Sequence, residues 1–268
     1  MKKIADYELL ERLGEGNQGV FYLARTPDRL GVDDAFCAVK VLGDQASKDA
    51  FRRMSNELRL FASVRSPHLV RLYDAGQQRG VLYYATAYHQ LGSLAAPRNS
   101  ARSLERRVAA VADAARGAHA LHEVGVAHRD IKPSNVLLSE SAAVLSDLGL
   151  TQVLSPGTTM TGFGPIGSIA YMEPGIAHGD PASRTSDVWS LAATLLTAVS
   201  GEQPFPDLPT ANLLQALDHI GRQSPRIPDG LPTGLRVIIA RGLDADRRKR
   251  PQSAQEFAEE LDEVRLDA

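Results

Sequence analysis

The apolar residues of this 268-residue chain change their spacing once, near Gly92. Before that point, short runs rich in β-branched and aromatic residues predict strands. After it, apolar residues recur every three or four positions, which predicts helices. The predicted strands cover residues 19–25, 36–42, 69–75 and 81–88. We therefore expect a small sheet-rich part followed by a larger helical part, and the crevice between two such unlike parts is a common ligand site.

Helical periodicity, with its period of about 3.6 residues, marks four segments. Residues 50–64 interrupt the strands. The longest helix starts near Leu104 and is expected to stop at Gly125, because glycine readily adopts the left-handed backbone that ends helices. Residues 187–199 predict a buried helix, since their most apolar part, residues 191–199, is about half of the roughly 20 residues that a membrane span needs. Residues 252–264 predict a terminal amphipathic helix.

Charge and cysteine content exclude several classes of function. Thirty Lys and Arg residues against 32 Asp and Glu give a formal net charge of -2, so no overall field favours nucleic acid or an anionic membrane. Cys37 is the only cysteine, so we expect no internal disulfide and a packed, buried residue. The N-terminus lacks the apolar stretch of a signal peptide. We expect a cytoplasmic location, no nucleic-acid partner and no membrane contact by this segment.

Gly14, Gly16 and Gly19 form a G-x-G-x-x-G pattern between two strand-like runs. Without side chains at these positions, backbone N–H groups could approach a phosphate. A plain hairpin turn with glycines at positive φ is the alternative. A dinucleotide-binding fold is disfavoured, because a strand follows the glycines where that fold needs a helix.

Lys40 lies in a predicted strand whose alternation places it with Ala38 on one face and Cys37 on the other. It could be an edge lysine whose ammonium group reaches water. Alternatively, it could pair with Glu57, which lies on or beside the apolar side of the helix at residues 50–64. A carboxylate there is costly unless it is paired, and the pair would hold a compact ammonium group near anionic oxygens.

A short hairpin follows the polar run at residues 128–135. Its strands, residues 136–138 and 143–146, are expected to be antiparallel, so Asn135 before the first and Asp147 after the second should be neighbours. An amide oxygen beside a carboxylate suits Mg²⁺ that is held jointly with substrate phosphates. Turn residues that cap their own backbone are the alternative for either residue alone.

These motifs together resemble the eukaryotic-type (Hanks-type) serine/threonine protein kinases, particularly the bacterial members, across essentially the whole chain. The matching elements occur in the family's order: the glycine loop, the Ala-Val-Lys ending at Lys40, Glu57, the His-Arg-Asp-Ile-Lys-Pro-Ser-Asn run and the Asp-Leu-Gly that starts at Asp147. The resemblance implies an α+β, bilobal protein-kinase-like fold. Residues 1–88 would form the small β-rich N-lobe with one helix, and residues 89–268 the larger, mainly helical C-lobe.

The resemblance also implies ATP and Mg²⁺ or Mn²⁺ as cofactors, and a protein with a Ser or Thr acceptor as substrate. Backbone amides near Gly16 and Gly19 would cover the ATP phosphates. Lys40, positioned by Glu57, would hold the α- and β-phosphates. The other residues implied in nucleotide binding are Leu13, Gly14, Val20, Ala38, Thr86, Tyr88 and Leu137. Among them, Val20, Ala38 and Leu137 would sandwich the adenine.

Within the polar run, the resemblance implies the catalytic roles. Asp130 would accept or orient the proton of the attacking hydroxyl, and Lys132 would neutralise charge on the transferring phosphoryl group. Asn135 and Asp147 would bind the metal. His128 would be a packed structural residue.

Regulation can be inferred from the long loop after Asp147. Arg129 is a cation without an assigned partner, and a phosphate on Thr159 or Thr161 could pair with it and order the loop. We therefore expect autophosphorylation there, with a homodimer as a possible arrangement for it. Polarity of the loop alone is the alternative reason for these threonines.

The chain departs from the family pattern in two places. Leu148 replaces the usual Phe, which we expect to cost little. In Met172-Glu173-Pro174-Gly175, the acid expected after the proline is replaced by Gly175. The ion pair of that acid with Arg250 would then be missing unless Glu173 or another carboxylate substitutes. We expect a looser substrate-docking segment with the chemistry retained.

Two other functions compete with an active protein kinase. A pseudokinase would bind nucleotide and regulate a partner without transferring phosphate, and the altered Gly175 is the feature that favours it. A small-molecule phosphotransferase of similar fold would share Asp130 and Asn135 but would not account for Lys132.

Two histidines lie near the end of the predicted helix that starts at Leu104. We expect His119 and His122 to line the exposed edge of this helix.

Overall fold

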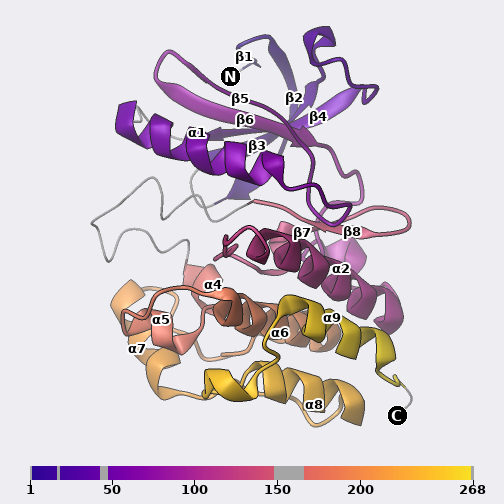
Figure 1. Ribbon diagram of the computed structural model, residues 1–268, viewed down its shortest axis with the longest axis vertical. Helices are drawn as coiled ribbons and strands as arrows, with labels where there is room; N and C mark the ends of the chain where they lie inside the picture. The colour runs from indigo at the N-terminus through magenta and orange to yellow at the C-terminus, as the bar shows by residue number, and fades with distance from the viewer. Residues whose placement is uncertain (1, 17–18, 43–47, 148–165, 267–268) are drawn as a thin grey trace. The chain divides into compact units, whose positions relative to one another are not determined.

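The computed structural model describes residues 2–16, 19–42, 48–147 and 166–266 (Figure 1). These residues form two compact units. The described part of the first unit lies within residues 2–63 and 70–89, and that of the second lies within residues 64–69, 90–147 and 166–266. The first unit is built on a sheet and the second on helices, as the change of apolar spacing predicted.

An antiparallel sheet of six strands forms the first unit, in the order β1-β2-β3-β4-β6-β5. Its strands are β1 (Lys3–Ile4), β2 (Tyr7–Gly16), β3 (Gly19–Arg25), β4 (Phe36–Leu42), β5 (Leu72–Gln78) and β6 (Val81–Ala87). β3 and β4 have the predicted bounds, and β6 ends one residue early. The prediction for β5 began three residues too soon, because Leu69 instead makes a parallel bridge to Leu145.

One face of this sheet forms the core of the first unit. Cys37 and Val39 of β4 pack there with Tyr7, and the alternation of side chains places Ala38 and Lys40 on the opposite face. Cys37 is fully buried, and burial raises the pKa of its thiol to about 11. The lone cysteine is therefore a packed, protonated side chain, as predicted.

Helix α1 (Lys48–Ser63) lies alongside β5 (Figure 1). It begins two residues before the predicted helix and ends one residue earlier. Leu58 and Phe61, which belong to its predicted apolar side, are both buried. The periodicity of this segment thus predicted both the helix and the side that packs.

The second unit is mainly helical. Its elements are α2 (Leu104–His122), β7 (Val136–Leu138), β8 (Ala143–Leu145), α4 (Ile166–Ile169), α5 (Pro174–Ala177), α6 (Arg184–Ser200), α7 (Leu213–Arg222), α8 (Thr233–Gly242) and α9 (Ala254–Glu263). Helix α6 packs against α2, α8 and α9, and every side chain from Ser186 to Leu196 is buried. Among the described residues, no helix combines the length and the apolar character needed to cross a membrane.

Local signals begin and end the two longest helices. The Ser103 hydroxyl accepts a hydrogen bond from the Arg106 N–H at the start of α2, and Gly125, with a φ of 78°, follows its end as predicted. Helix α6 begins with a capping box in which Ser183 and Ser186 bond each other's backbone N–H groups. These caps satisfy N–H groups that have no partner within the helix.

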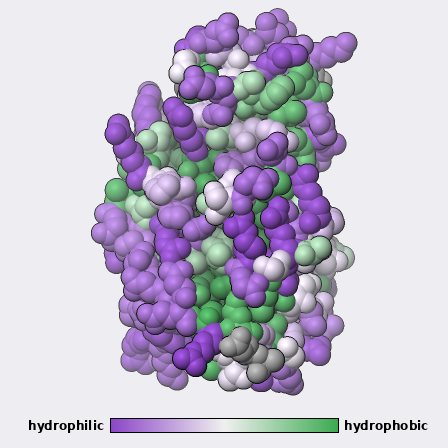
Figure 2. All heavy atoms as spheres, turned by 90° about the vertical axis from the view of Figure 1, so that its right-hand side faces the viewer, coloured by the Kyte–Doolittle hydropathy of each residue, from purple (hydrophilic) through white to green (hydrophobic). Residues whose placement is uncertain are grey.

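Charged side chains on the surface pair locally. Figure 2 shows one face of the molecule, on which hydrophilic side chains predominate and apolar ones form smaller areas. Arg116 pairs with Asp262, and Arg241 pairs with both Glu256 and Glu260. Such pairing of opposite charges agrees with the small net charge of the chain.

Gly19 begins β3 where the sheet leaves no room for a side chain. A Cβ atom added there would lie 2.2 Å from the carbonyl oxygen of Val41, whereas one added at Gly14 would meet no atom within 4 Å. We expect Gly19→Ala to force β3 and β4 apart and to lower the free energy of unfolding by about 1–3 kcal/mol. Urea denaturation measures this loss, and Gly14→Ala is the matched control, with an expected change of about 0.5 kcal/mol or less. Equal losses in the two variants would contradict the packing argument.

Candidate active site

The predicted hairpin is present and brings Asn135 and Asp147 to the same end of two strands. β7 and β8 pair antiparallel, with Val136 opposite Leu145. Beyond that pair, the N–H of Ser146 donates to the carbonyl oxygen of Asn135 at 2.8 Å. Asp147 follows directly, with a φ of 57°. The predicted hairpin is confirmed, but its second strand ends at Leu145, one residue early, and Asn135 lies opposite Ser146, with Asp147 one residue further along.

The side chain of Asn135 is oriented by its own loop. Its Nδ2 donates to the carbonyl oxygen of Asp130 at 2.7 Å and to Asp130 Oδ2 at 3.2 Å. Both donors of the amide group are thereby engaged, and its Oδ1 accepts from the Ser134 hydroxyl at 3.5 Å. This amide oxygen and the carboxylate of Asp147, which follows the other strand of the hairpin, are hard-oxygen groups of the kind that Mg²⁺ prefers.

Asp130, Lys132 and Ser168 form a connected polar group. Lys132 Nζ donates to the two carboxylate oxygens of Asp130 at 3.0 and 2.8 Å and to the Ser168 hydroxyl at 2.8 Å. Burial raises the pKa of Asp130, although the Lys132 ammonium opposes this shift. Asp130 is thus a partly desolvated carboxylate with a fixed counter-ion, which is the arrangement expected of a proton acceptor.

A second buried carboxylate, Asp187, holds the backbone just before Asp130. Its Oδ2 accepts from the N–H of His128 at 2.7 Å, and its Oδ1 accepts from the N–H of Arg129 at 2.9 Å. Arg129 has a φ of 69°, in the left-handed region that non-glycine residues rarely adopt. Asp187 therefore stabilises an unfavourable backbone conformation next to Asp130.

His128 is fully buried, as predicted for a structural residue. Its Nε2 lies 3.0 Å from the carbonyl oxygen of Ser146, and its Nδ1 accepts from the N–H of Asp130 at 3.4 Å. Burial lowers the pKa of the imidazole. These contacts assign the neutral form with the proton on Nε2. This bond from Nε2 ties residues 128–135, named the catalytic loop after the family they resemble, to the hairpin.

The prediction that His122 lies on an exposed helix edge is wrong. His122 is buried, and its Nε2 lies 2.7 Å from Asp187 Oδ2. The helical period placed His122 near the border of the apolar side, and the distant carboxylate of Asp187 accounts for its burial. His119 is partly buried.

The register of the sheet corrects one expected nucleotide contact. Residues opposite each other in neighbouring strands share a face, and Phe21 is opposite Lys40, whereas Val20 is opposite Val41. Val41 belongs to the core face. Phe21, rather than the expected Val20, therefore lies on the face that carries Ala38 and Lys40.

Lys40 is buried on a central strand, because β4 lies between β3 and β6. This position excludes an edge lysine that reaches water. Its Nζ lies 4.8 Å from the ring centre of Phe21 and 5.9 Å from that of Tyr84, so aromatic faces stabilise the ammonium group on two sides. Glu57 lies on α1 and is partly buried, and its pairing with Lys40 stays a prediction.

The glycine pattern spans the junction of β2 and β3. Gly14 and Gly16 lie at the end of β2, opposite Phe21 and Gly19. Neither Gly14 nor Gly19 has a positive φ. The alternative of a plain hairpin turn with glycines at positive φ therefore does not apply to these two positions. Gly19 is needed for strand packing, whereas the space beside Gly14 is open.

The remaining expected nucleotide residues occupy various positions in the two units. Thr86 is buried on β6, opposite Ala38 and therefore on the same face. Tyr88 directly follows β6 and is partly buried, Leu13 is exposed on β2, and Leu137 is partly buried on β7. Leu148, Thr159 and Thr161 lie outside the described residues.

Glu173 makes the ion pair that the sequence left in doubt. Arg250 Nη1 donates to Glu173 Oε1 at 2.7 Å, and both side chains are buried. The substitution at Gly175 has therefore not removed the ion pair, because the acid two residues earlier replaces the missing one. The substrate-docking segment was predicted to be loose because this ion pair was expected to be missing. Since the ion pair is present, that reason no longer applies.

Sequence reasoning missed two residues of the polar site. Ser168 stands in a run without periodicity, and nothing local indicates that its hydroxyl meets Lys132. Asp187 lies at the start of the predicted buried helix, but its contacts with the catalytic loop span almost 60 positions of sequence. The sequence did contain one signal for Asp187. An acid in the first turn of an apolar, buried helix needs hydrogen-bond partners, so its presence indicates that other residues contact it.

Comparison with known proteins agrees with this geometry. Residues 7–261 match the sequence profile of the protein kinase domain. The serine/threonine-protein kinase PknJ of Mycobacterium tuberculosis is 32% identical over 95% of this chain and 44% of its own length. PknD of the same organism is 32% identical over 94% of this chain and 38% of its own length. AfsK of Streptomyces griseus is 32% identical over 91% of this chain and 30% of its own length. The chain thus spans less than half the length of these relatives.

We expect His128 to stay neutral at pH values where an exposed imidazole is protonated. Burial lowers the pKa of His128 in the folded protein. In the unfolded chain the same imidazole has the ordinary pKa of about 6.5. The free energy of unfolding should therefore fall as the pH decreases below about 6.5, with His128 contributing up to about 1.4 kcal/mol per pH unit. Nitrogen NMR of histidine-labelled protein should show the Nε2–H tautomer at neutral pH, and the His128 ring should become protonated only at a lower pH than the histidines of the unfolded chain. Protonation of the His128 ring at the same pH as in the unfolded chain would contradict this assignment.

Proposed function

Since this chain belongs to the protein kinase family, we propose that it transfers the γ-phosphoryl group of ATP to Ser or Thr hydroxyls of proteins. The observation that carries this proposal is the polar group of Asp130, Lys132 and Asn135, in which each side chain is oriented by another. Phosphoryl transfer requires mainly alignment and charge compensation. This loop offers an acceptor for a proton, a fixed cation and an oriented amide oxygen.

The proposed reaction uses Asp130 as the proton acceptor. The substrate hydroxyl oxygen forms a new bond to the γ-phosphorus, and the bond from that phosphorus to the β,γ-bridging oxygen breaks, which releases ADP. The hydroxyl proton passes to Asp130, whose raised pKa favours accepting it. Lys132 would neutralise charge on the transferring group, and its ammonium group also donates a hydrogen bond to the Ser168 hydroxyl.

The oxygen donors at the open end of the hairpin fit a divalent cation. Asn135 Oδ1 and the carboxylate of Asp147 would hold Mg²⁺ or Mn²⁺, since the amide nitrogen of Asn135 is already used by Asp130. When bound, the ion would compensate the negative charge of the phosphates.

The first unit would supply the other nucleotide contacts. We propose that Lys40 binds the α- and β-phosphates, with its ammonium group placed by Phe21 and Tyr84. Phe21 joins Ala38 and Thr86 as a candidate for contact with the base, because the register puts all of them on one face. Backbone N–H groups of Gly14, Gly16 and Gly19 remain candidates for the phosphates, Glu57 for positioning Lys40, and Leu13, Tyr88 and Leu137 for the base.

Arg129 supports a proposal for regulation by phosphorylation. Its backbone is fixed by Asp187, while its side chain is exposed beside the catalytic loop. A phosphate on Thr159 or Thr161 could bind this guanidinium group. Autophosphorylation of these residues, within a homodimer, is the corresponding proposal.

A pseudokinase is the alternative function. The absent acid at position 175 was the feature that favoured it, and the ion pair of Glu173 with Arg250 removes that reason. Retention of Lys40, Asp130, Asn135 and Asp147 favours an active enzyme.

We expect Asp130→Asn to lower phosphate transfer by about 10²- to 10⁴-fold, because the variant lacks the proton acceptor. Incubation with labelled ATP and Mg²⁺, with and without a basic acceptor protein, measures transfer, and calorimetry checks that nucleotide binding is retained. Mapping the labelled residues tests Thr159 and Thr161. Unchanged transfer by the variant would exclude Asp130 as the acceptor. Nucleotide binding without transfer by the unaltered protein would support the pseudokinase.

Loss of the Phe21 ring should weaken ATP binding. Phe21→Leu keeps an apolar side chain but removes the aromatic face 4.8 Å from Lys40 Nζ. We expect the dissociation constant for MgATP to rise about two- to thirtyfold. Phe21→Tyr retains the ring and is the matched control. Equal affinity of the Leu and Tyr variants, measured by calorimetry, would show that the ring does not place the ammonium group.

A further inference from the structure

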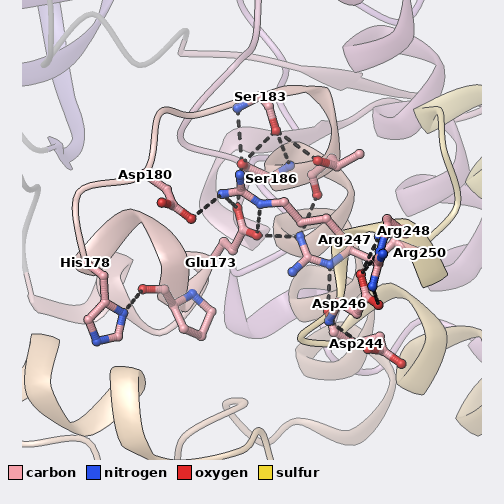
Figure 3. A network of polar contacts seen from close by, with 12 residues as sticks. Glu173, His178, Asp180, Ser183, Ser186, Asp244, Asp246, Arg247, Arg248 and Arg250 are labelled. Carbon is pink, nitrogen blue, oxygen red and sulfur yellow. Dashed lines mark hydrogen bonds and ion pairs between the residues drawn. The ribbon is translucent and has the colours of Figure 1, made fainter.

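Glu173 is the centre of a buried polar cluster outside the residues assigned above (Figure 3). Its Oε1 accepts from Arg247 Nε at 2.6 Å and from Arg250 Nη1 at 2.7 Å. Its Oε2 accepts from Arg247 Nη2 at 2.8 Å and from the Ser186 hydroxyl at 2.6 Å. Arg247 thus binds the carboxylate through two parallel bonds, an arrangement that fixes orientation as well as distance.

The charges of this cluster are compensated. Burial alone would raise the pKa of Glu173, but hydrogen bonds from Arg247, Ser186 and Arg250 outweigh it and lower the pKa. Arg250 has further partners, because its Nε donates to the carbonyl oxygen of Asp244 at 2.7 Å. Glu173 is therefore an ionised, fully bonded side chain at neutral pH.

Arg247 and Asp180 occupy the space beside Gly175. A Cβ atom added at Gly175 would lie 2.6 Å from Asp180 Oδ2 and 3.3 Å from Arg247 Nη2. These two side chains also face each other, with 3.4 Å between Arg247 Nη2 and Asp180 Oδ2. An acid at position 175 would have to displace them, so Glu173, Gly175 and Arg247 form a matched set.

The segment that carries Glu173 leads to the polar site. Ser168, near its start, receives a hydrogen bond from Lys132. The carbonyl oxygen of Tyr171 accepts from the Ser190 hydroxyl of α6 at 2.9 Å. At its end, Glu173 binds Ser186, the residue directly before Asp187. The first turns of α6 therefore hold both this segment, through Ser186, and the catalytic loop, through Asp187.

We propose that Glu173 and Arg247 are positioning residues for the protein substrate. They hold residues 168–173 on α6, in a fixed relation to the catalytic loop, and so keep the Ser168 hydroxyl on Lys132. This proposal rests on the kinase activity proposed above. Neither residue touches the reacting atoms, and both act through the segment between them and Ser168.

The test compares Arg247→Ala with Arg248→Ala. Arg247→Ala removes two bonds to Glu173 but leaves the Arg250 pair, so the variant should fold, and Arg248 is an exposed neighbour that pairs only with Asp246 among the described residues. We expect Arg247→Ala to raise the KM for an acceptor protein about tenfold or more. The KM for ATP should change by less than about twofold. Arg248→Ala should match the unaltered protein.

Hydrogen exchange supplies a readout that does not need activity. Amides of residues 168–177 should exchange faster in Arg247→Ala, and faster still in Glu173→Gln, while those of α2 stay protected. If the unaltered protein transfers no phosphate, the proposed function fails, and the exchange rates still decide whether Arg247 holds the segment. Unchanged exchange and unchanged KM for the acceptor in Arg247→Ala would overturn the proposal.

Moving the acid tests the matched set directly. Glu173→Ala combined with Gly175→Glu restores the family's pattern, but a Cβ atom at position 175 lies 2.6 Å from Asp180 Oδ2 and 3.3 Å from Arg247 Nη2. We expect this double variant to show the same fast exchange at residues 168–177 as Glu173→Gln, because Asp180 crowds and repels the new acid. Adding Asp180→Ala should vacate the nearer space and slow the exchange again by letting the new acid reach Arg247 or Arg250. Full protection in the double variant would show that the space beside position 175 does not determine where the acid can lie.

Discussion

The buried carboxylate of Asp187 is the interaction on which the candidate active site depends. It accepts hydrogen bonds from the backbone of His128 and Arg129, and its third partner is the imidazole of His122. Because Asp187 is 1% exposed, these bonds form in a medium of low dielectric constant, where an unpaired charge is costly. The loop that carries Asp130 is thus placed by a helix of the core, and its geometry follows from how α6 packs.

Features that depend on local periodicity could be predicted from the sequence. The bounds of β3 and β4 and the apolar side of α1 follow from alternation or helical spacing, and the structure has them. The neighbouring positions of Asn135 and Asp147 follow from the geometry of a short hairpin. Each of these predictions needed only residues that are close together in the chain.

Features that depend on the phase of a face or on distant partners could not be predicted in the same way. Val20 and Phe21 are consecutive in β3, so their side chains lie on opposite faces of the sheet. Only the register of β3 with β4 shows which of the two shares a face with Lys40. His122 was placed on an exposed edge because its partner, Asp187, is remote in sequence. Glu173 could be named only as one of several possible substitutes, since the choice depends on where Arg247 and Arg250 lie.

The left-handed backbone at Arg129 has a consequence for any state in which α6 is not packed beside it. A φ of 69° costs a non-glycine residue such as arginine about 1–2 kcal/mol, so a short peptide with this sequence would populate other conformations. The hydrogen bond from the Arg129 N–H to Asp187 compensates for this cost. A chain whose helices have formed, but in which Asp187 is not docked, would therefore lack the bond that holds the backbone next to Asp130.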